Sequence, residues 1–223
     1  MPNGVSRYAE RNKKTGLVRR TRTRSRLIEA GIRVFLDFGF EAPVIEDFVA
    51  AADVSRGSFY NHFQTKEELL EAVSTVLRKE LMVTYEEAKL RISDPAERLV
   101  GGIRFLIRNS RENPRWGLLL LQMPASVSSA EAEFRRGPRR DLKDCISRGI
   151  LPKQNLEIGV DLIIGTTGQG IRAAASLARP QDYPEQIATL LLMALGMEPS
   201  MAAEIARRPF QDLSAVTSEL PAN

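Results

Sequence analysis

Residues 44–70 read VIEDFVAAADVSRGSFYNHFQTKEELL, and this stretch decides the fold of the region around it. Apolar residues recur at helical spacing in its first third, which predicts a short helix over 44–51 with one buried face. Residues 52–54 interrupt that spacing, and Ser55 can cap a second helix that runs to about His62. Two short helices joined by a three-residue turn form a helix-turn-helix, which places its second helix in the major groove of DNA.

The second helix presents polar and basic side chains outward, whereas Phe59 and Phe63 are predicted to point inward. Arginine is the best bidentate donor to guanine, so Arg56 at the start of the helix is predicted to read a base. Gly57 costs roughly 1 kcal/mol relative to alanine inside a helix, and close approach to a phosphate backbone would explain it. Lys66 opens the next helix, and a helix N-terminus with a lysine forms a phosphate site. The residues of this stretch predicted to contact DNA are Ser55, Arg56, Gly57, Ser58, Tyr60, Asn61, His62 and Lys66.

The string SRGSFYNHF at 55–63, followed by KEEL at 66–69, resembles the signature of the TetR family of bacterial transcriptional regulators. The resemblance covers about residues 23–73. It implies an all-α fold with an N-terminal three-helix DNA-binding head that contains the helix-turn-helix. It also implies that a long helix joins this head to a larger C-terminal helical domain for ligand binding and dimerisation.

Two positions depart from the family pattern. Asp53 stands in the turn where members usually have glycine, and aspartate tolerates the left-handed conformation better than most residues, so the turn is expected to survive. Pro43 and Val44 stand where members usually begin the first helix of the motif with threonine or serine. Proline suits a first helical turn, but the hydroxyl that touches a phosphate in the family is replaced here.

Charge is concentrated before the motif. Residues 1–26 carry nine basic side chains against one acid, a balance of +8, whereas the rest of the chain sums to −4. Residues 1–22 lack apolar periodicity until near their end, so they are predicted to form a basic arm that is disordered when free. Basic N-terminal arms bind nucleic acid, and Arg19, Arg20 and Arg22 are therefore predicted to contact DNA. A solubilising tail is the alternative.

The remainder of the head follows from the same periodicity. Thr23 is predicted to cap a first helix that ends near Phe38, before Gly39. The predicted domains are a helix-turn-helix DNA-binding domain over 23–68, a helical effector-binding and dimerisation domain over 69–210 and a loose tail over 211–223. The predicted three-helix core consists of Leu27, Ile28, Gly31, Val34, Phe35, Phe38, Ile45, Phe48, Val54, Phe59 and Phe63.

Beyond the head, every segment with a clear period reads as helix. Lys66 begins a long helix to about residue 91, Asp94 caps another and Pro114 opens a short one. Asn155 caps a long helix rich in small residues, and a helix over 185–195 is apolar on nearly all sides, so its second face needs a cover. In one small domain that cover is naturally a second copy of the chain, as the family resemblance also implies. The predicted dimer-interface residues are Gly165, Gly168, Ile171, Ala175, Ile187 and Leu191.

A small-molecule effector is predicted to bind beside the long helix, because only such a ligand can move the attached head. An aromatic and methionine lining suits a bulky, largely apolar ligand, although ordinary core packing explains the same residues. The predicted pocket residues are Phe105, Trp116, Leu119, Met123 and Phe134. The arginines of 135–140 are interpreted as a solvated basic face, or alternatively as a second contact to DNA or to an anionic ligand.

Composition and motifs argue against other functions. No apolar run reaches the roughly 18 residues of a membrane helix, and the N-terminus has no apolar secretory core, so a cytoplasmic protein is predicted. Cys145 is the only cysteine, interpreted as a small buried hydrophobe rather than a redox sensor. His62 is the only histidine and lies in the motif, so no catalytic triad can be assembled. No catalytic residue, metal or cofactor is predicted.

These observations predict a dimeric, sequence-specific DNA-binding regulator of transcription. It is expected to repress from a pseudo-palindromic double-stranded operator and to be released by a small, largely apolar effector. Two alternatives stay open: a DNA-binding protein whose C-terminal domain recruits a protein partner, and a small helical enzyme.

Overall fold

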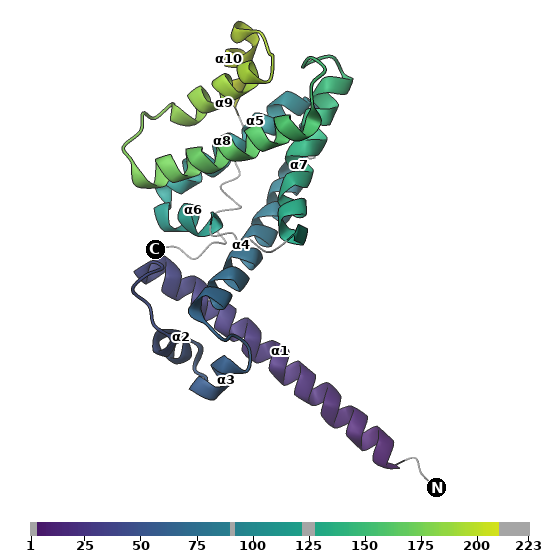
Figure 1. The fold of residues 1–223 in the computed structure, drawn as a ribbon, viewed down its shortest axis with the longest axis vertical. Coiled ribbons are helices and arrows are strands. Elements are labelled where there is room, and N and C mark those ends of the chain that lie inside the picture. The colour runs from purple at the N-terminus through teal and green to yellow at the C-terminus, as the bar shows by residue number, and fades with distance from the viewer. Residues whose placement is uncertain (1–3, 90–91, 122–127, 210–223) are drawn as a thin grey trace. The chain divides into compact units, whose positions relative to one another are not determined.

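The computed structural model describes residues 4–89, 92–121 and 128–209, and every regular element among them is a helix (Figure 1). The all-α prediction is therefore confirmed. The chain divides between Val73 and Ser74 into two compact units. The helices are α1 (Gly4–Phe38), α2 (Ile45–Ala52), α3 (Arg56–Tyr60), α4 (Lys66–Lys89), α5 (Pro95–Glu112), α6 (Pro114–Leu120), α7 (Ser128–Ser147), α8 (Leu156–Ser176), α9 (Tyr183–Ala194) and α10 (Pro199–Arg207).

The first helix is longer than the sequence predicts. It begins at Gly4, whereas residues 1–22 were predicted to be disordered and Thr23 to be the cap, so the structure corrects both predictions. The Thr23 hydroxyl instead donates to the backbone carbonyl of Arg19 at 3.1 Å, inside the helix. The reason is that arginine, lysine, alanine and glutamate are good helix formers. Once the apolar face further along the helix is packed, adding residues at its N-terminus costs little.

The core of the first unit is aromatic and agrees with most of the predicted set. The rings of Phe35 and Phe48 lie 4.9 Å apart, and Phe59 is fully buried. Phe38, predicted in this core, is 65% exposed, which corrects that prediction. The chain turns after Phe38, and the ring of Phe40 folds back to 6.0 Å from that of Phe35, leaving the last helical residue outside.

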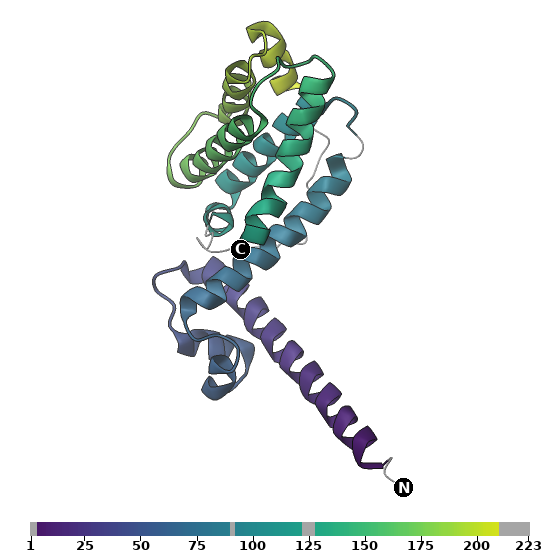
Figure 2. The same cartoon turned by 45° about the vertical axis from the view of Figure 1, so that its right-hand side comes forward.

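In the second unit, α5 lies at the centre and contacts α6, α7, α8, α9 and α10 (Figure 2). Its predicted cap is confirmed, because the Asp94 carboxylate accepts hydrogen bonds from the backbone N–H groups of Ala96 and Glu97. Small residues let a neighbour approach closely: a Cβ added at Gly170 of α8 would lie 2.6 Å from Ile107 Cδ1. The predicted stripe of α5 is buried, namely Leu99, Val100, Ile103, Leu106 and Ile107.

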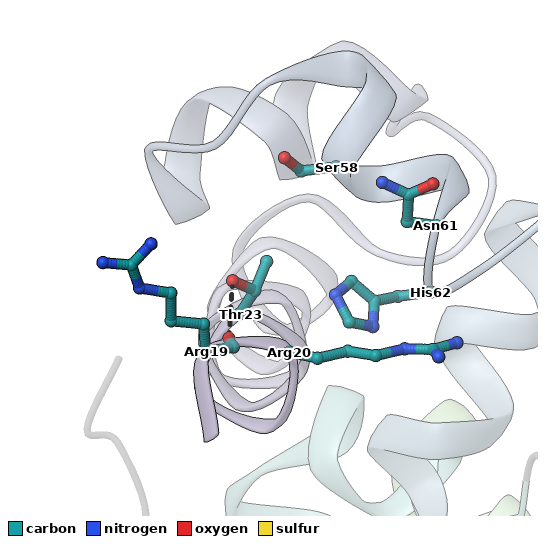
Figure 3. Close-up of a pocket in the computed structure, with 6 residues that line it drawn as sticks. All are labelled: Arg19, Arg20, Thr23, Ser58, Asn61 and His62. Carbon is teal, nitrogen blue, oxygen red and sulfur yellow. Dashed lines mark hydrogen bonds between the residues drawn. The ribbon is translucent and has the colours of Figure 1, made fainter. Parts of the chain in front are cut away.

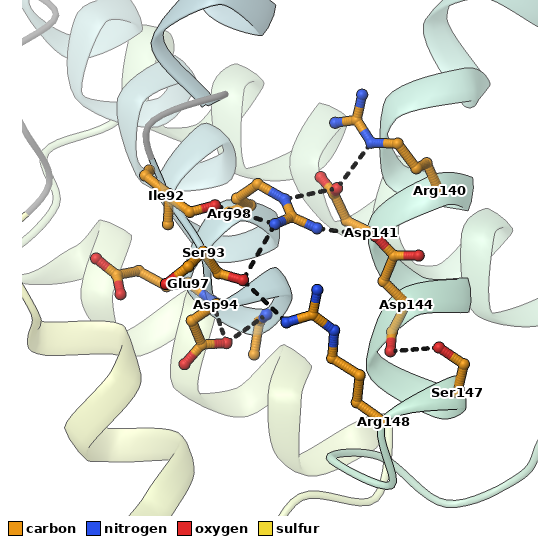
Figure 4. A network of polar contacts seen from close by, with 11 residues as sticks. Ile92, Ser93, Asp94, Glu97, Arg98, Arg140, Asp141, Asp144, Ser147 and Arg148 are labelled. Atoms are coloured by element: carbon orange, nitrogen blue, oxygen red, sulfur yellow. Dashed lines mark hydrogen bonds and ion pairs between the residues drawn. The ribbon is translucent and has the colours of Figure 1, made fainter.

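A polar network joins the start of α5 to α7 (Figure 4). The Arg98 guanidinium pairs with Asp141 at 3.1 Å and with Asp144 at 2.9 Å. Asp141 is fully buried, and Arg140 also reaches it at 3.1 Å. Burial and the nearby carboxylates raise the pKa of the buried Cys145 thiol to about 12, which agrees with the small-hydrophobe interpretation.

The basic run on α7 is largely engaged within the second unit. Arg135 pairs with Asp161 of α8 at 2.7 Å, and Arg139 pairs with Glu157 at 2.8 Å. These contacts favour the interpretation of a charged face over that of a second DNA contact.

Candidate nucleic-acid interface

The turn between α2 and α3 has the conformation that the sequence predicts. Asp53 lies in the left-handed region, at φ 48° and ψ 57°, and is the only non-glycine residue with positive φ among those described. Arg26 of α1 fixes the turn from outside, because one guanidinium nitrogen lies 2.9 Å from the Asp53 carbonyl oxygen and 3.1 Å from its carboxylate. Aspartate therefore replaces the family's glycine without loss of the turn.

The start of α2 compensates in part for its missing hydroxyl. Val44 stands at the N-cap and offers no side-chain acceptor, but the Asp47 carboxylate accepts the Val44 N–H at 2.8 Å. This is the returning half of a capping box. The helix end is stabilised, whereas a hydroxyl that could donate to a phosphate is absent at this position.

Ser55 caps α3 as predicted, and its hydroxyl accepts the Ser58 N–H at 3.1 Å. Regular helix ends at Tyr60, earlier than predicted, and Asn61 and His62 follow as a turn. The buried rings of Phe59 and Phe63 anchor this segment to the core. The outward side chains are thus held on a short but well-anchored support.

Arg56, the predicted base reader, has a partner that the sequence did not indicate. Its guanidinium pairs with the Glu46 carboxylate of α2 at 2.6 Å, and both side chains stay more than half exposed. The Arg56 Cζ also lies 5.8 Å from the centre of the Tyr60 ring. Arg56 is therefore held in one orientation at the exposed N-terminus of α3.

Gly57 has no steric reason within the chain to be glycine. Its φ is not positive, it is exposed, and the nearest heavy atom to an added Cβ would be Ser55 Oγ at 3.9 Å. A helical glycine without an internal reason points to a requirement from outside the chain, such as a closely approaching molecule.

Beside α3 lies a hollow of about 410 Å³ that we call the α1–α3 hollow (Figure 3). Hydroxyl, amide, imidazole and guanidinium groups line it, and none of the lining residues is acidic. Such a set of donors suits phosphate oxygens, which position a protein on DNA without reading its sequence. The lining residues are Arg19, Arg20, Thr23, Ser58, Asn61 and His62.

His62 is the titratable group of this hollow with the lowest ordinary pKa. Partial burial lowers its pKa below 6.5, and the positive charges of Arg20 and Arg24 lower it further. The imidazole is therefore neutral near pH 7 and offers one N–H donor to a phosphate. The charge of the hollow then comes from its two arginines.

Besides Ser55, Arg56, Gly57 and Tyr60, two further predicted DNA contacts do not line the hollow. Arg22 is exposed on α1, and Lys66 donates to the backbone carbonyl of Glu41 at 3.1 Å. Lys66 thus ties the segment between α1 and α2 to the start of α4, so the structure gives it a local structural contact.

Sequence reasoning missed Thr23 in the hollow and Glu46 beside Arg56. Thr23 follows Arg19 and Arg20 at helical spacing, so a continuous α1 would have revealed it. Glu46 becomes a neighbour of Arg56 only through the crossing of two helices, for which the sequence has no signal.

The predicted effector residues fall into two groups. Trp116 and Leu119 are buried on α6 and Phe105 is half-buried on α5, whereas Met123 and the side chain of Phe134 lie outside the described residues. Among the described residues, the Trp116 Nε1–H and the Nδ2 amide of Asn109 on α5 are buried donors that find no acceptor. The Leu119 carbonyl accepts the hydroxyl of Ser74 on α4 at 3.2 Å, which connects α6 to α4.

The predicted dimer residues need correction at two positions. Leu191 and Ile171 are each only 2% exposed, so their side chains pack in the interior of the chain itself. Leu190, directly before Leu191, is 60% exposed, because successive residues of a helix point about 100° apart. The large exposed apolar residues of α8 and α9 are Ile158, Leu162, Leu190 and Met193. Gly165 is exposed on α8, and Ala175 and Ile187 are half-buried. Gly168 is also half-buried, and a Cβ added to it would lie 3.8 Å from Leu121 Cδ2.

Within the described residues, no group of histidine, cysteine, aspartate and glutamate side chains is arranged to hold a metal ion. None of the helices in that part of the chain is long and apolar enough to cross a membrane.

Comparison with protein families gives two matches. The model for bacterial regulatory proteins of the tetR family matches residues 27–73, from α1 to the first part of α4. A model described as the tetracyclin repressor-like C-terminal domain matches residues 94–208, which is more than half of the chain.

Individual relatives match about a third of the chain. The chain is 39% identical over 75 residues to the HTH-type transcriptional repressor DhaR of Mycobacterium sp. (strain GP1), covering 32% of this chain and 38% of DhaR. It is 30% identical over 78 residues to the HTH-type transcriptional repressor KstR2 of Mycolicibacterium smegmatis (strain ATCC 700084 / mc(2)155), covering 35% of this chain and 38% of that repressor. The match thus spans less than two-fifths of either repressor.

Solved structures extend the similarity to the second unit. RolR in complex with the ligand resorcinol has a TM-score of 0.75 and 27% identity, covering 88% of this chain and 99% of RolR. RolR without ligand has a TM-score of 0.73 and 26% identity, covering 85% and 99%.

Proposed function

The chain belongs to the TetR family of bacterial regulatory proteins, and on that premise we propose that it is a homodimeric repressor of a pseudo-palindromic DNA operator. The observation that carries this proposal is the α1–α3 hollow, which gathers guanidinium and neutral donors beside the exposed face of α3. Phosphates in the hollow would fix the register of the protein on DNA, so that Arg56 reaches a base edge.

Selection from a random pool of DNA duplexes tests this function. The purified chain should enrich one pseudo-palindromic sequence and bind it about 10³-fold or more tightly than a random duplex at the same salt concentration. Equal affinities for the two duplexes would contradict the proposal.

The role of the hollow has its own test. Arg20→Ala removes one guanidinium from it, so the slope of log affinity against log salt should become shallower by about 0.9. Lys153→Ala removes an equal charge from an exposed position of the second unit and serves as the control. Identical slopes for the two variants would remove the hollow from the interface.

We propose that a small, largely apolar effector carrying an acceptor oxygen binds beside α6. Trp116 on α6 and Asn109 on the contacting α5 each carry a buried donor without an acceptor, which supports an acceptor oxygen on the ligand, because an unpaired buried donor costs about 1–3 kcal/mol. RolR, similar over most of this chain, has been crystallised with resorcinol, a phenol. The class of effector we propose is therefore a small phenol or a related oxygen-bearing aromatic.

The route from effector to DNA would run through α4. Its first residues belong to the unit that contains α3, and Ser74 hydrogen-bonds the carbonyl of Leu119 on α6. A ligand that displaces α6 would shift α4 and, in a dimer, change the spacing of the two recognition helices. Those helices must sit about one DNA turn, roughly 34–36 Å, apart.

Thermal unfolding with resorcinol and other simple phenols tests the effector. A ligand that binds the folded state raises the midpoint temperature of unfolding. A true effector must also loosen DNA binding, because it can change the spacing of the two recognition helices only if it binds the two spacings with different affinities. Trp116→Phe keeps an aromatic ring but deletes the N–H, so it should reduce the midpoint shift. A full shift in this variant would exclude Trp116 from the site.

The dimer would form through the exposed apolar faces of α8 and α9. These two helices contact each other, and Ile158, Leu162, Leu190 and Met193 leave apolar area in water that a second copy would cover. Gly165 on the same face of α8 has open space around it, which suits a closely packed partner helix. This assignment keeps the predicted helices but changes the residues on them.

A further inference from the structure

We propose that Glu46 is a specificity-determining residue that acts through Arg56. Its carboxylate orients the guanidinium toward a base edge and withholds the arginine's charge from non-specific phosphate contacts. This inference rests on the proposed DNA-binding function and adds to it a residue outside α3.

The geometry holds Arg56 from two sides. Glu46 Oε1 lies 2.6 Å from Arg56 Nη1, while the Tyr60 ring lies below the guanidinium, 5.8 Å from its Cζ. The Tyr60 hydroxyl is 3.5 Å from Arg56 Nη2. Glu46 stands in the first turn of α2, whose far end is joined to α3 by the turn at Asp53 that Arg26 holds. The turn therefore fixes the two helices that carry the charged groups.

Stability does not explain this ion pair. The Glu46 and Arg56 side chains are 57% and 65% exposed, and an ion pair so open to solvent contributes little to folding. The pair does restrict a long, flexible side chain, and immobilising such a side chain at a binding interface otherwise weakens affinity roughly 2- to 10-fold. Orientation in the free protein would remove that loss for the correct DNA sequence.

The carboxylate also discriminates against the DNA backbone. An arginine without a partner can bind any phosphate, which favours every sequence equally and steepens the salt dependence by about 0.9 per contact. A guanidinium paired with a carboxylate has less charge free for a phosphate, whereas its remaining N–H donors can still reach guanine. The Glu46–Arg56 pair thus favours base edges over phosphates, and specificity often depends on such an element that disfavours the wrong contacts.

The test is Glu46→Gln, which keeps the shape and removes the charge. Affinities are measured for the duplex selected by the unaltered chain and for a random duplex of equal length, over a range of salt. Binding to the random duplex should tighten roughly 3- to 10-fold with a salt slope steeper by about 0.9. The ratio of the two affinities should fall about tenfold.

Two controls isolate the cause. Glu29→Gln removes an exposed acid from α1 of the same unit and should leave the affinity ratio unchanged. In an Arg56→Ala background, Glu46→Gln should also leave the ratio unchanged, because a residue that acts through Arg56 has no effect once Arg56 is gone. Unfolding midpoints should agree among the variants.

The outcomes separate this inference from the proposed function. If the unaltered chain prefers the selected duplex and the Glu46→Gln variant has the same ratio of affinities for the two duplexes, the role of Glu46 is overturned and the proposed function stands. An effect that persists in the Arg56→Ala background overturns the route through Arg56. Failure of the unaltered chain to prefer any duplex overturns the function and this inference together.

Discussion

Replacing Gly57 by alanine should change folding stability and DNA affinity in opposite directions. In the free protein the new methyl group meets only Ser55 Oγ at 3.9 Å, and the backbone is not in the left-handed region. The substitution removes a helical glycine, so the free energy of unfolding should rise by about 0.5–1 kcal/mol. On DNA the same methyl group would stand where the backbone of the duplex approaches. Overpacking of about 1–3 kcal/mol should weaken binding roughly 5- to 150-fold.

Urea unfolding and duplex titration measure the two effects on one preparation of the variant. Gly39→Ala is the contrasting control, because Gly39 also has open space but lies at φ +80°, so alanine there should lower stability. If Gly57→Ala stabilises the chain and binds the selected duplex as tightly as the unaltered chain, no DNA approaches α3 at this position. That result would refute the reasoning from Gly57.

Three further predictions concern the rest of the molecule. Arg98→Leu should lower the free energy of unfolding by about 3 kcal/mol, because it removes a guanidinium that compensates the negative charge of the fully buried Asp141. Urea unfolding measures this loss, and a change near zero would contradict the prediction. Leu190→Glu should give folded monomers in analytical ultracentrifugation, because the Leu190 side chain is 60% exposed. Leu191→Glu should unfold the chain, because Leu191 is only 2% exposed and a buried charge there would be unpaired. Dimers of the Leu190→Glu variant would place the interface elsewhere. His62 has a lowered pKa in the folded state, so the folded chain binds its proton less readily than the unfolded chain and loses stability as pH falls through 6.5 and below. The loss between about pH 7.5 and 5.5 should be smaller in His62→Asn, and an equal loss would assign it to other groups.

The parts of the interface that the sequence predicted are those decided by short-range chemistry. The cap at Ser55, the left-handed Asp53 and the inward rings of Phe59 and Phe63 each depend on residues within a few positions. The extent of α1 does not depend on nearby residues alone. The arginine-rich composition of its N-terminal part predicts disorder, whereas the packed face further along the helix supports helical structure through that part.

The missed features depend on contacts between helices. An almost wholly apolar helix such as α9 carries no periodic signal, so its sequence cannot distinguish the buried Leu191 from the exposed Leu190. Glu46 and Arg56 are ten positions apart and meet only because α2 and α3 cross. The unpaired donors of Asn109 and Trp116 likewise emerge only once α5 and α6 are packed.

Hydroxyl-radical footprinting of the chain on its selected duplex tests the central claim most directly. Two recognition helices in a dimer should protect two regions whose centres lie about one DNA turn, roughly 10 base pairs, apart, with α3 in the major groove of each half-site. Leu190→Glu, if monomeric, should reduce the protection of both regions at the same protein concentration. A single protected region, or none on a duplex that the chain enriches, would contradict a dimeric operator-binding protein.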